Sequence, residues 1–330
     1  MKTLRTETVN GVRHLVLCRA AEYNTITPAL RDELAAAIDA ADDDRDVHVI
    51  LLRAEGPAFC AGYGLDWSTA AEAQQVVYDA ADPSQMNLDR PNEANEPASA
   101  VASRRRAGPS PSSAVASRRR AGPSPSSPPR IWDSVADYGM MSRFVETYMK
   151  LWYAKKPTIA AVQGWCIGGG TDMVLCADVI VAGDDARFGY PPARVWGTPT
   201  TAMWVYRMGL ERTKRYLLTG DEIPAKTAEE IGLVLEVVPA ADLLAHATAL
   251  AERMARLPVN QLVMLKLLCN QTVENMGLAS SRLLGTLFDG VARHTQEGLD
   301  FVRRSQQAGF RQAVRERDDP FGDYGSRRKR

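Results

Sequence analysis

Three consecutive glycines at 168–170 stand two residues before the carboxyl group of Asp172, in the stretch GWCIGGGTD. Glycine runs are unfavourable in backbone entropy, so folded proteins keep them where a Cβ would obstruct a positive φ or the close approach of a bound group. The flanking residues predict a strand before the glycines and a helix after them, so the first amides of the helix would face an anion or a developing oxyanion. Asp172 would place an acid or a base beside that charge.

The glycine spacing does not favour a nucleotide as that anion. No Lys-Ser/Thr pair follows the glycines as a P-loop requires, and Gly164 with the run at 168–170 does not give the GxGxxG pattern. Tight packing of a helix on a strand is the alternative explanation that these residues leave open.

The composition argues against several classes of protein. The chain has 330 residues, 45% of them hydrophobic, and 40 basic residues balance 40 acidic ones, so no basic field favours nucleic acid as a partner. No stretch approaches ~20 consecutive apolar residues, and the N-terminus lacks the apolar core of a signal peptide. We therefore expect a cytoplasmic protein without a membrane span. Five scattered cysteines and four dispersed histidines predict reduced thiols, with Cys166 in the core, and no metal site.

The elements around the glycines indicate an α/β body. KPTIAAVQG before them predicts a buried strand, and TDMVLCADVIVAG after them predicts a helix followed by a second strand. Nearer the N-terminus, a strand hairpin, a helix capped by Thr27 and the strand VHVILLRAEG precede a second small-residue turn, AFCAGYGLDW. A further helix is expected after Asp133. From Pro239 onward the pattern is helical alone, which predicts a helical C-terminal appendage.

A compositional break interrupts this body at 91–130. The segment is rich in Pro, Ser, Ala and Arg, and AVASRRRAGPSPSS occurs twice in tandem, at 100–113 and 114–127. It lacks an apolar period and would not bury enough surface to offset its ordering entropy, so we expect a disordered insertion. Its arginine triplets could contact RNA or a membrane surface. Without interleaved aromatic residues they are better explained as solvated linker charge.

Taken together, the two turns and their neighbours resemble the crotonase (enoyl-CoA hydratase/isomerase) superfamily, from about Val12 to Phe310 with the insertion excepted. AFCAGYGLDW resembles the family's A-F-x-A-G segment, and KPTIAAVQGWCIGGG resembles its K-P-x-I-A-A-x-x-G-x-x-x-G-G-G segment. RAAEYNTI and LTGDEIPAKTAEEIGLVLEVVP match two further family segments in the same order. Several ordered motifs at family spacing are far more specific than any one alone.

The resemblance implies a crotonase-like α/β fold, a spiral of ββα units with a C-terminal helical oligomerisation region. Residues 1–90 and 131–240 would form the acyl-CoA-binding core, 91–130 the disordered insertion, and 241–330 the helical region that assembles trimers or hexamers. The resemblance also implies that a coenzyme A thioester is the substrate and that no further cofactor is held.

In such enzymes two backbone amides, one from each glycine-bearing turn, hold the thioester carbonyl oxygen and stabilise the enolate formed from it. By position these would be the amides of Tyr63 and Gly169. Asp172 falls where a hydratase carries the first of two catalytic glutamates, although it could instead only complement the helix dipole. The other positions of the two turns that the resemblance assigns to substrate binding are Ala61, Gly62, Leu65, Gly168 and Gly170.

One position departs from the family's pattern. The second glutamate, expected in an F-G-x-P-E context, corresponds to Pro192 in FGYPPAR, and proline exchanges no proton. The GGGxD context resembles a dienoyl-CoA isomerase branch, but Thr200 stands where that branch has a further aspartate. We therefore expect an enoyl-CoA hydratase/isomerase-type enzyme with Asp172 as its acid or base. Thioester hydrolysis, C–C cleavage and a non-catalytic CoA-binding scaffold remain open.

Several other residues are candidates for substrate contacts. Tyr190, Arg194 and Trp196 lie near Pro192 in the sequence and are expected to shape the acyl pocket. TQEGLDFVRRSQ resembles the family helix that completes the CoA site, so Phe301 would pack beside adenine and Arg304, or its neighbour Arg303, would meet the 3′-phosphate.

Overall fold

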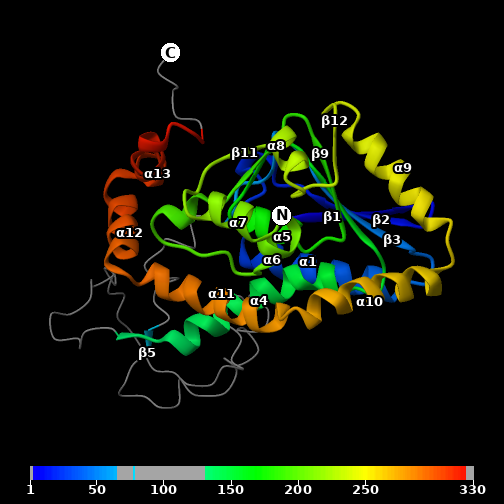
Figure 1. The fold of residues 1–330 in the computed structure, drawn as a ribbon, viewed down its shortest axis with the longest axis horizontal. Helices are drawn as coiled ribbons and strands as arrows, with labels where there is room; N and C mark the ends of the chain where they lie inside the picture. Colours follow the sequence, from blue (N-terminus) through cyan, green and yellow to red (C-terminus); the bar gives the residue numbers. More distant parts are fainter. Residues whose placement is uncertain (1–2, 65–76, 79–130, 325–330) are drawn as a thin grey trace, which may run out of the picture.

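The computed structural model describes residues 3–64, 77–78 and 131–324 (Figure 1). The insertion predicted at 91–130 and the candidate substrate residue Leu65 lie outside the described residues. Most of the remaining chain forms two β-sheets and the helices that cover them.

A six-stranded sheet forms the centre of the fold, in the order β1-β2-β3-β7-β9-β12. Its strands are β1 (Leu4–Val9), β2 (Val12–Leu17), β3 (Val49–Ala54), β7 (Thr158–Val162), β9 (Val179–Gly183) and β12 (Glu236–Val238). The pair β1-β2 is antiparallel, which confirms the predicted N-terminal hairpin, and the other four pairs are parallel.

A four-stranded sheet lies beside it, in the order β11-β10-β8-β4. Its strands are β11 (Ile223–Pro224), β10 (Arg187–Gly189), β8 (Trp165–Ile167) and β4 (Ala58–Cys60). Each of β4, β8 and β10 follows within a few residues of β3, β7 or β9, so the chain alternates between the two sheets as it winds. This is the predicted spiral of ββα units. A short ladder joins β5 (Val77–Tyr78) to β6 (Ile131–Trp132).

The helices begin where the sequence signals them. Thr27 caps α1 (Pro28–Asp43) by accepting a hydrogen bond from the Leu30 amide, and Asp133 caps α4 (Ser134–Tyr153). The remaining helices of the α/β body are α5 (Gly169–Val174), η4 (Pro191–Arg194), α6 (Met203–Met208), α7 (Leu210–Leu217) and α8 (Ala225–Glu230). The predicted C-terminal helical region comprises α9 (Leu243–Ala255), α10 (Val259–Asn275), α11 (Leu278–Arg293), α12 (Gln296–Ala308), α13 (Phe310–Asp318) and η5 (Asp319–Phe321). A short η1 (Ala20–Glu22) follows β2.

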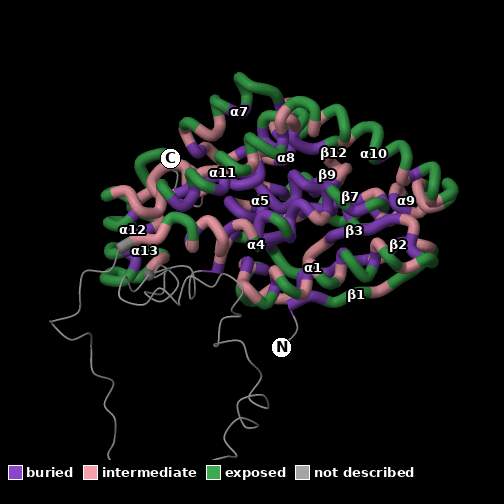
Figure 2. The backbone as a smooth tube through the Cα atoms, turned by 90° about the horizontal axis from the view of Figure 1, so that it is seen from below, coloured by how far each residue is buried: buried purple, intermediate pink, exposed green. Residues whose placement is uncertain are grey.

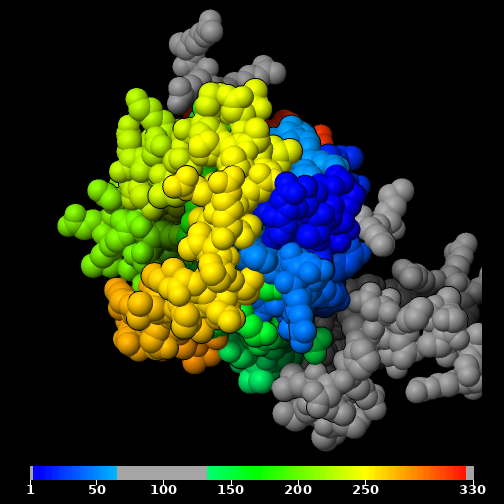
Figure 3. Space-filling view, turned by 90° about the vertical axis from the view of Figure 1, so that its right-hand side faces the viewer, coloured from blue at the N-terminus to red at the C-terminus, as the bar shows by residue number. Residues whose placement is uncertain are grey.

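The core lies on both faces of the six-stranded sheet because successive strand residues point to opposite sides. Val49 and Leu51 of β3 pack with residues of α9, while Ile50 and Leu52 face the larger core that contains α1, α4 and α5. In Figure 3 the yellow residues of α9 run beside the blue N-terminal strands. In Figure 2, α5 lies among the buried residues, whereas α10, α12 and α13 expose much of their length.

Two local expectations need correction. The glycine run follows β8, a short strand of the second sheet, and not the longer strand β7 that the sequence pattern predicts directly before it. A three-residue strand has no detectable periodicity, which is why the pattern missed it. Cys60, Cys166 and Cys176 are buried as expected, but Cys269 is exposed on α10.

Candidate active site

Three turns meet at the carboxyl ends of neighbouring strands of the four-stranded sheet. β4 pairs in parallel with β8, placing Cys60 opposite Cys166, and β8 pairs in parallel with β10, placing Ile167 opposite Gly189. The residues that follow each strand therefore emerge side by side at one sheet edge. In α/β proteins this is the edge where ligands bind.

The two glycine-bearing turns touch through their backbones. A Cβ at Gly62 would lie 3.0 Å from the Ile167 carbonyl oxygen and 3.9 Å from the Gly169 nitrogen. A Cβ at Gly170 would lie only 2.5 Å from the carbonyl oxygen of Cys60. The glycines are needed because any side chain at Gly170 would separate the turns, and because Gly168 has a φ of +58°.

The Tyr63 side chain lies over the start of α5. A Cβ at Gly169 would be 2.7 Å from a Tyr63 ring carbon, and the ring also packs edge-on against Phe144 with centroids 5.4 Å apart. The Tyr148 hydroxyl donates a hydrogen bond of 3.1 Å to the Tyr63 hydroxyl. Burial raises the pKa of both phenols far above their usual value, so both stay neutral at physiological pH.

Asp172 is fully buried within α5, and its carboxylate accepts three hydrogen bonds. Its Oδ2 accepts from the Thr200 amide at 2.7 Å and the Thr200 hydroxyl at 3.0 Å, and its Oδ1 accepts from Trp204 Nε1 at 2.8 Å. Burial raises the pKa of Asp172 from 3.8 to about 6, and these three donors oppose that rise. The carboxylate thus holds the 200–204 segment against the glycine turn and titrates near neutral pH.

Pro192 lies directly against the glycine turn. It belongs to η4, which follows β10, and its Cγ would be 3.6 Å from a Cβ placed on Gly168. Its carbonyl oxygen accepts the amides of Val195, Trp196 and Gly197, which folds the 192–197 loop back on itself. The position for which the resemblance implies an acid is therefore next to the glycine turn, but it supplies a ring without a titratable group.

A second buried carboxylate approaches the same place from the C-terminal helices. A Cβ on Gly197 would lie 3.0 Å from Pro192 Cβ, 3.4 Å from Asp289 Oδ1 and 3.7 Å from the Tyr190 hydroxyl oxygen. Burial raises the pKa of Asp289, although its ion pair with Arg293 opposes the rise. Sequence reasoning missed this residue because an Asp and an Arg four positions apart indicate an ordinary pair on a helix surface.

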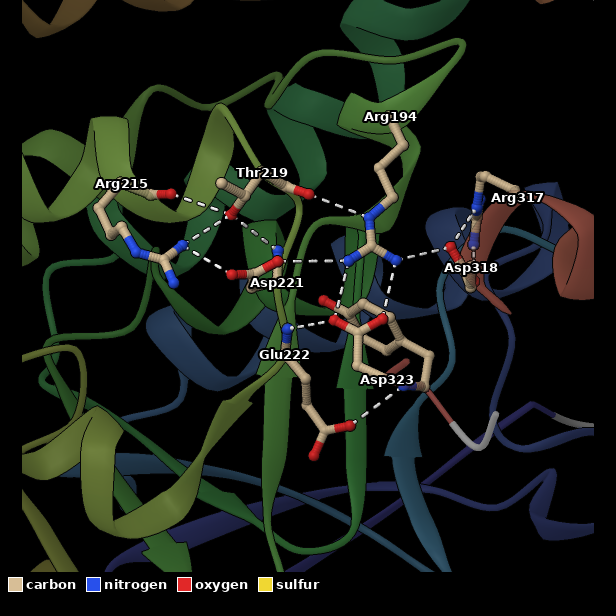
Figure 4. A network of polar contacts seen from close by, with 9 residues as sticks. Arg194, Arg215, Thr219, Asp221, Glu222, Arg317, Asp318 and Asp323 are labelled. Atoms are coloured by element: carbon tan, nitrogen blue, oxygen red, sulfur yellow. Dashed lines mark hydrogen bonds and ion pairs between the residues drawn. The ribbon is translucent and has the colours of Figure 1, made fainter. Parts of the chain in front are cut away.

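Arg194, at the end of η4, forms ion pairs with the C-terminal segment. Its buried guanidinium pairs with Asp318 at 2.9 Å, with Asp323 through two bonds of 2.9 and 2.8 Å, and with Asp221 at 3.5 Å (Figure 4). The Phe321 ring packs on it, with 3.9 Å from the guanidinium carbon to the ring centroid. Arg194 thus fastens the C-terminal segment to η4, and its contact with an acyl group stays a prediction.

The other C-terminal candidates cluster together. Phe301 is buried between Trp196 and Phe310, with ring centroids 4.9 and 6.0 Å away. Arg304 is exposed and forms a two-point ion pair with Glu316, and this pair lowers the pKa of Glu316 to about 2. Trp196 and Phe301 are therefore brought together, whereas Arg304 lies at the surface on the α12–α13 pair.

The part of the chain that the structure covers contains neither a cluster of metal ligands nor a membrane-spanning helix. Among residues 3–64, 77–78 and 131–324, no group of three or more His, Cys, Asp or Glu side chains is arranged to hold a metal ion. Within the same residues, no helix is both long and apolar enough to cross a membrane.

Comparisons with known proteins agree on one family. The Enoyl-CoA hydratase/isomerase family model matches residues 7–93 and 134–312. A Mycobacterium tuberculosis protein named "Putative enoyl-CoA hydratase EchA13" is 29% identical over 84% of this chain and 76% of its own length. A 2,3-dehydroadipyl-CoA hydratase of Escherichia coli is 31% identical over 54% of this chain and 74% of its own. The crystal structure of an enoyl-CoA hydratase from Mycobacterium smegmatis superimposes with a TM-score of 0.78 at 38% identity, covering 99% of this chain and 97% of that one.

Proposed function

Because the chain belongs to the enoyl-CoA hydratase/isomerase family, we propose that it binds an unsaturated acyl-CoA and holds the thioester oxygen between the amides of Tyr63 and Gly169. The observation that carries this proposal is the close approach of the two glycine-bearing turns. A Cβ added to Gly62 would lie only 3.9 Å from the Gly169 nitrogen. Two such donors stabilise the charge that develops on the oxygen as an enolate forms. Each is worth ~3 kcal/mol of transition-state stabilisation.

A pair of substitutions at Gly169 isolates the backbone donor. Gly169→Ala and Gly169→Pro both add a Cβ that crowds the Tyr63 ring, but only proline removes the amide hydrogen, and proline is tolerated at a first helical position. We expect turnover of an enoyl-CoA to be ~100-fold lower in Gly169→Pro than in Gly169→Ala. Equal turnover of the two variants would remove this amide from the mechanism.

We propose that Asp172 exchanges a proton with substrate or water. Two of its three hydrogen bonds go to Oδ2 and one to Oδ1, so the second lone pair of Oδ1 is where a proton would be accepted. Asp172→Asn should lower kcat ~100-fold and leave acyl-CoA affinity nearly unchanged. Thr200→Val is the matched control, because it removes one donor and keeps the carboxylate. Full turnover in Asp172→Asn would assign the residue to structure alone.

The reaction we propose is addition of water to the α,β double bond, with double-bond isomerisation as the second candidate. Pro192 favours the second candidate, because one carboxylate that removes and returns a proton suffices for isomerisation. A Dictyostelium discoideum relative, 27% identical over 71% of this chain and 64% of its own, carries the name Delta(3,5)-Delta(2,4)-dienoyl-CoA isomerase. Mass-resolved assays with enoyl- and dienoyl-CoA separate hydration, which adds 18 Da, from isomerisation, which adds nothing. Binding without any product would indicate a CoA-binding scaffold.

We also propose that α10 and α11 mediate assembly into trimers or hexamers. Both helices expose large apolar side chains: Met264, Leu265, Leu267, Leu268, Leu283, Leu284, Leu287, Phe288 and Val291. Such a surface is typical of a contact between subunits. Leu268→Lys should lower the mass measured by light scattering, whereas Leu218→Lys, on an exposed leucine of the α7 C-terminus, should not. An unchanged mass in Leu268→Lys would move the interface elsewhere.

A further inference from the structure

We propose that Asp289, on α11, is a second proton-transferring carboxylate of this active site and takes the place that Pro192 leaves without an acid. The inference rests on the proposed acyl-CoA chemistry and adds a residue that the sequence motifs do not contain. Its carboxylate arrives from the C-terminal helical region, nearly 100 positions beyond Pro192 in the sequence.

The position of the carboxylate is the first argument. Asp289 Oδ1, Pro192 Cβ and the Tyr190 hydroxyl all lie within 4 Å of the same point, a Cβ position on Gly197. The other side of the Pro192 ring faces Gly168 of the glycine turn, at 3.6 Å from a Cβ position there. Asp289 therefore reaches the neighbourhood of residue 192 without belonging to that segment, and a side chain at Gly197 would crowd Pro192 and Asp289 Oδ1.

The charge balance around Arg293 is the second argument. Arg293 pairs with two buried carboxylates, Asp137 at 2.7 Å and Asp289 at 3.1 Å. One guanidinium cannot neutralise two carboxylates, so the cluster carries a surplus negative charge when both are ionised. A buried surplus of this kind is relieved by taking up a proton.

The hydrogen bonds indicate which carboxylate takes that proton. Asp137 has the shorter contact with Arg293, a further donor in Trp132 Nε1 at 3.1 Å, and His294 Nδ1 at 3.6 Å. Asp289 has the longer contact and an amide donor from Thr198. Because the ionised form of Asp289 is less well satisfied, and because burial raises its pKa, Asp289 is the member that takes up the proton.

The titratable groups that face Asp289 come from several elements. Asp137 of α4 and Asp172 of α5 are negative neighbours, and Arg293 of its own helix is positive. Tyr190 is a buried neutral phenol and Tyr63 a partly buried one. The charge of Asp289 in turn raises the pKa of Asp172. The two carboxylates are therefore coupled, as two acids that share one reaction need to be.

The proton balance of the step requires no added reactant. In hydration, the water oxygen forms a bond to the β-carbon, and the π electrons move into the thioester enolate. The proton lost by that oxygen passes to the ionised carboxylate of Asp289. Collapse of the enolate then takes a proton at the α-carbon from the protonated carboxyl group of Asp172. Transfer of the proton held by Asp289 to Asp172 restores both groups, so water is the only reagent consumed.

The decisive test compares Asp289→Asn with Asp137→Asn in the full-length enzyme, using the same enoyl-CoA. We expect Asp289→Asn to lower kcat ~100-fold with KM within a few-fold, and to abolish one limb of the pH–rate profile. Asp137 contacts the same Arg293, and its charge raises the pKa of Asp289. Asp137→Asn should therefore keep that limb of the pH–rate profile and shift it to lower pH. Asp289→Glu, which restores a carboxylate, should recover the limb.

Three outcomes would overturn the inference. Unchanged kcat and an intact pH limb in Asp289→Asn would refute the role of Asp289 while leaving the proposed function standing. Equal losses of kcat and of melting temperature in Asp289→Asn and Asp137→Asn, without any shift of the limb, would show that both carboxylates only neutralise Arg293. A wild-type enzyme that binds acyl-CoA and turns over neither enoyl- nor dienoyl-CoA would refute the proposed function together with this inference.

Discussion

Replacing Arg194 with methionine should release the C-terminal segment from the body of the protein. The Arg194 side chain is only 2% exposed, and it joins η4 to Asp318 and Asp323 across more than 120 positions of sequence (Figure 4). Its Nε also donates to the Thr219 carbonyl oxygen at 3.0 Å. Methionine replaces the aliphatic stem of arginine with an apolar chain of similar length, and it removes every one of these donors.

The expected loss of stability follows from the environment of each partner. Breaking a buried ion pair by removing one member typically costs about 3–5 kcal/mol, because the other charge stays buried without a partner. Asp318 keeps its two-point pair with Arg317 at 2.7 Å, and the side chain of Asp323 is 17% exposed, so both carboxylates are partly relieved. We therefore expect a loss of about 3 kcal/mol at the lower end of that range, most of it as local opening of residues 318–324.

Hydrogen exchange measured by mass spectrometry, together with urea unfolding, checks this expectation. Peptides that cover 318–324 should exchange faster in Arg194→Met, while β7 and β9 should keep their protection. Arg304→Met is the matched control, because Arg304 also pairs at two points with a C-terminal carboxylate, Glu316, but at the exposed surface; it should change neither measurement. Unchanged exchange of 318–324 in Arg194→Met would refute the reasoning.

Other perturbations test the site itself. Because burial raises the pKa of Asp172 from 3.8 to about 6, the folded protein binds a proton between those pH values that the unfolded chain does not. The free energy of unfolding should therefore fall by about 2.5 kcal/mol from pH 4 to pH 7, and in urea titrations this slope should be absent from Asp172→Asn. Gly170→Ala, whose Cβ would meet the Cys60 carbonyl oxygen at 2.5 Å, should lose about 1–3 kcal/mol of stability and most turnover, whereas Gly209→Ala, with no atom within 4 Å, should keep its turnover in the same assay. Trp204→Phe removes the donor to Asp172 Oδ1, a hydrogen bond that lowers the pKa of Asp172. The fall in the free energy of unfolding should therefore extend to higher pH in this variant.

The elements that could be predicted from the sequence are those whose residues determine them locally. Thr27 and Asp133 were identified as caps because a cap needs only its own side chain and the next two or three amides. Strands β3 and β7 were identified because both are continuous apolar runs. The resemblance to a known family then supplied the spiral that joins them, which no local pattern contains.

The features that could not be predicted from the sequence depend on contacts between distant segments of the chain. The ion pairs of Arg194 with Asp318 and Asp323, at the far end of the chain, had no signal in the sequence around Pro192. Asp289 carries no motif, since its importance comes from lying beside Gly197 and Tyr190 after folding. Spacing along a sequence identifies residues that act through their own segment, and it carries no information about a side chain that a different segment supplies.

The same difference separates the glycine turn, which backbone contacts fix, from the carboxylate that we propose beside position 192. Two neighbouring strands define the turn through their backbones, and a Cβ at Gly170 would meet the Cys60 carbonyl oxygen at 2.5 Å, so that position has no freedom to change. A carboxylate needs to place only one oxygen atom beside the turn, and a side chain from any element packed there can do so. The Pro192 carbonyl binds three following amides and turns Gly197 toward α11. The proline thereby shapes the loop beside which Asp289 lies.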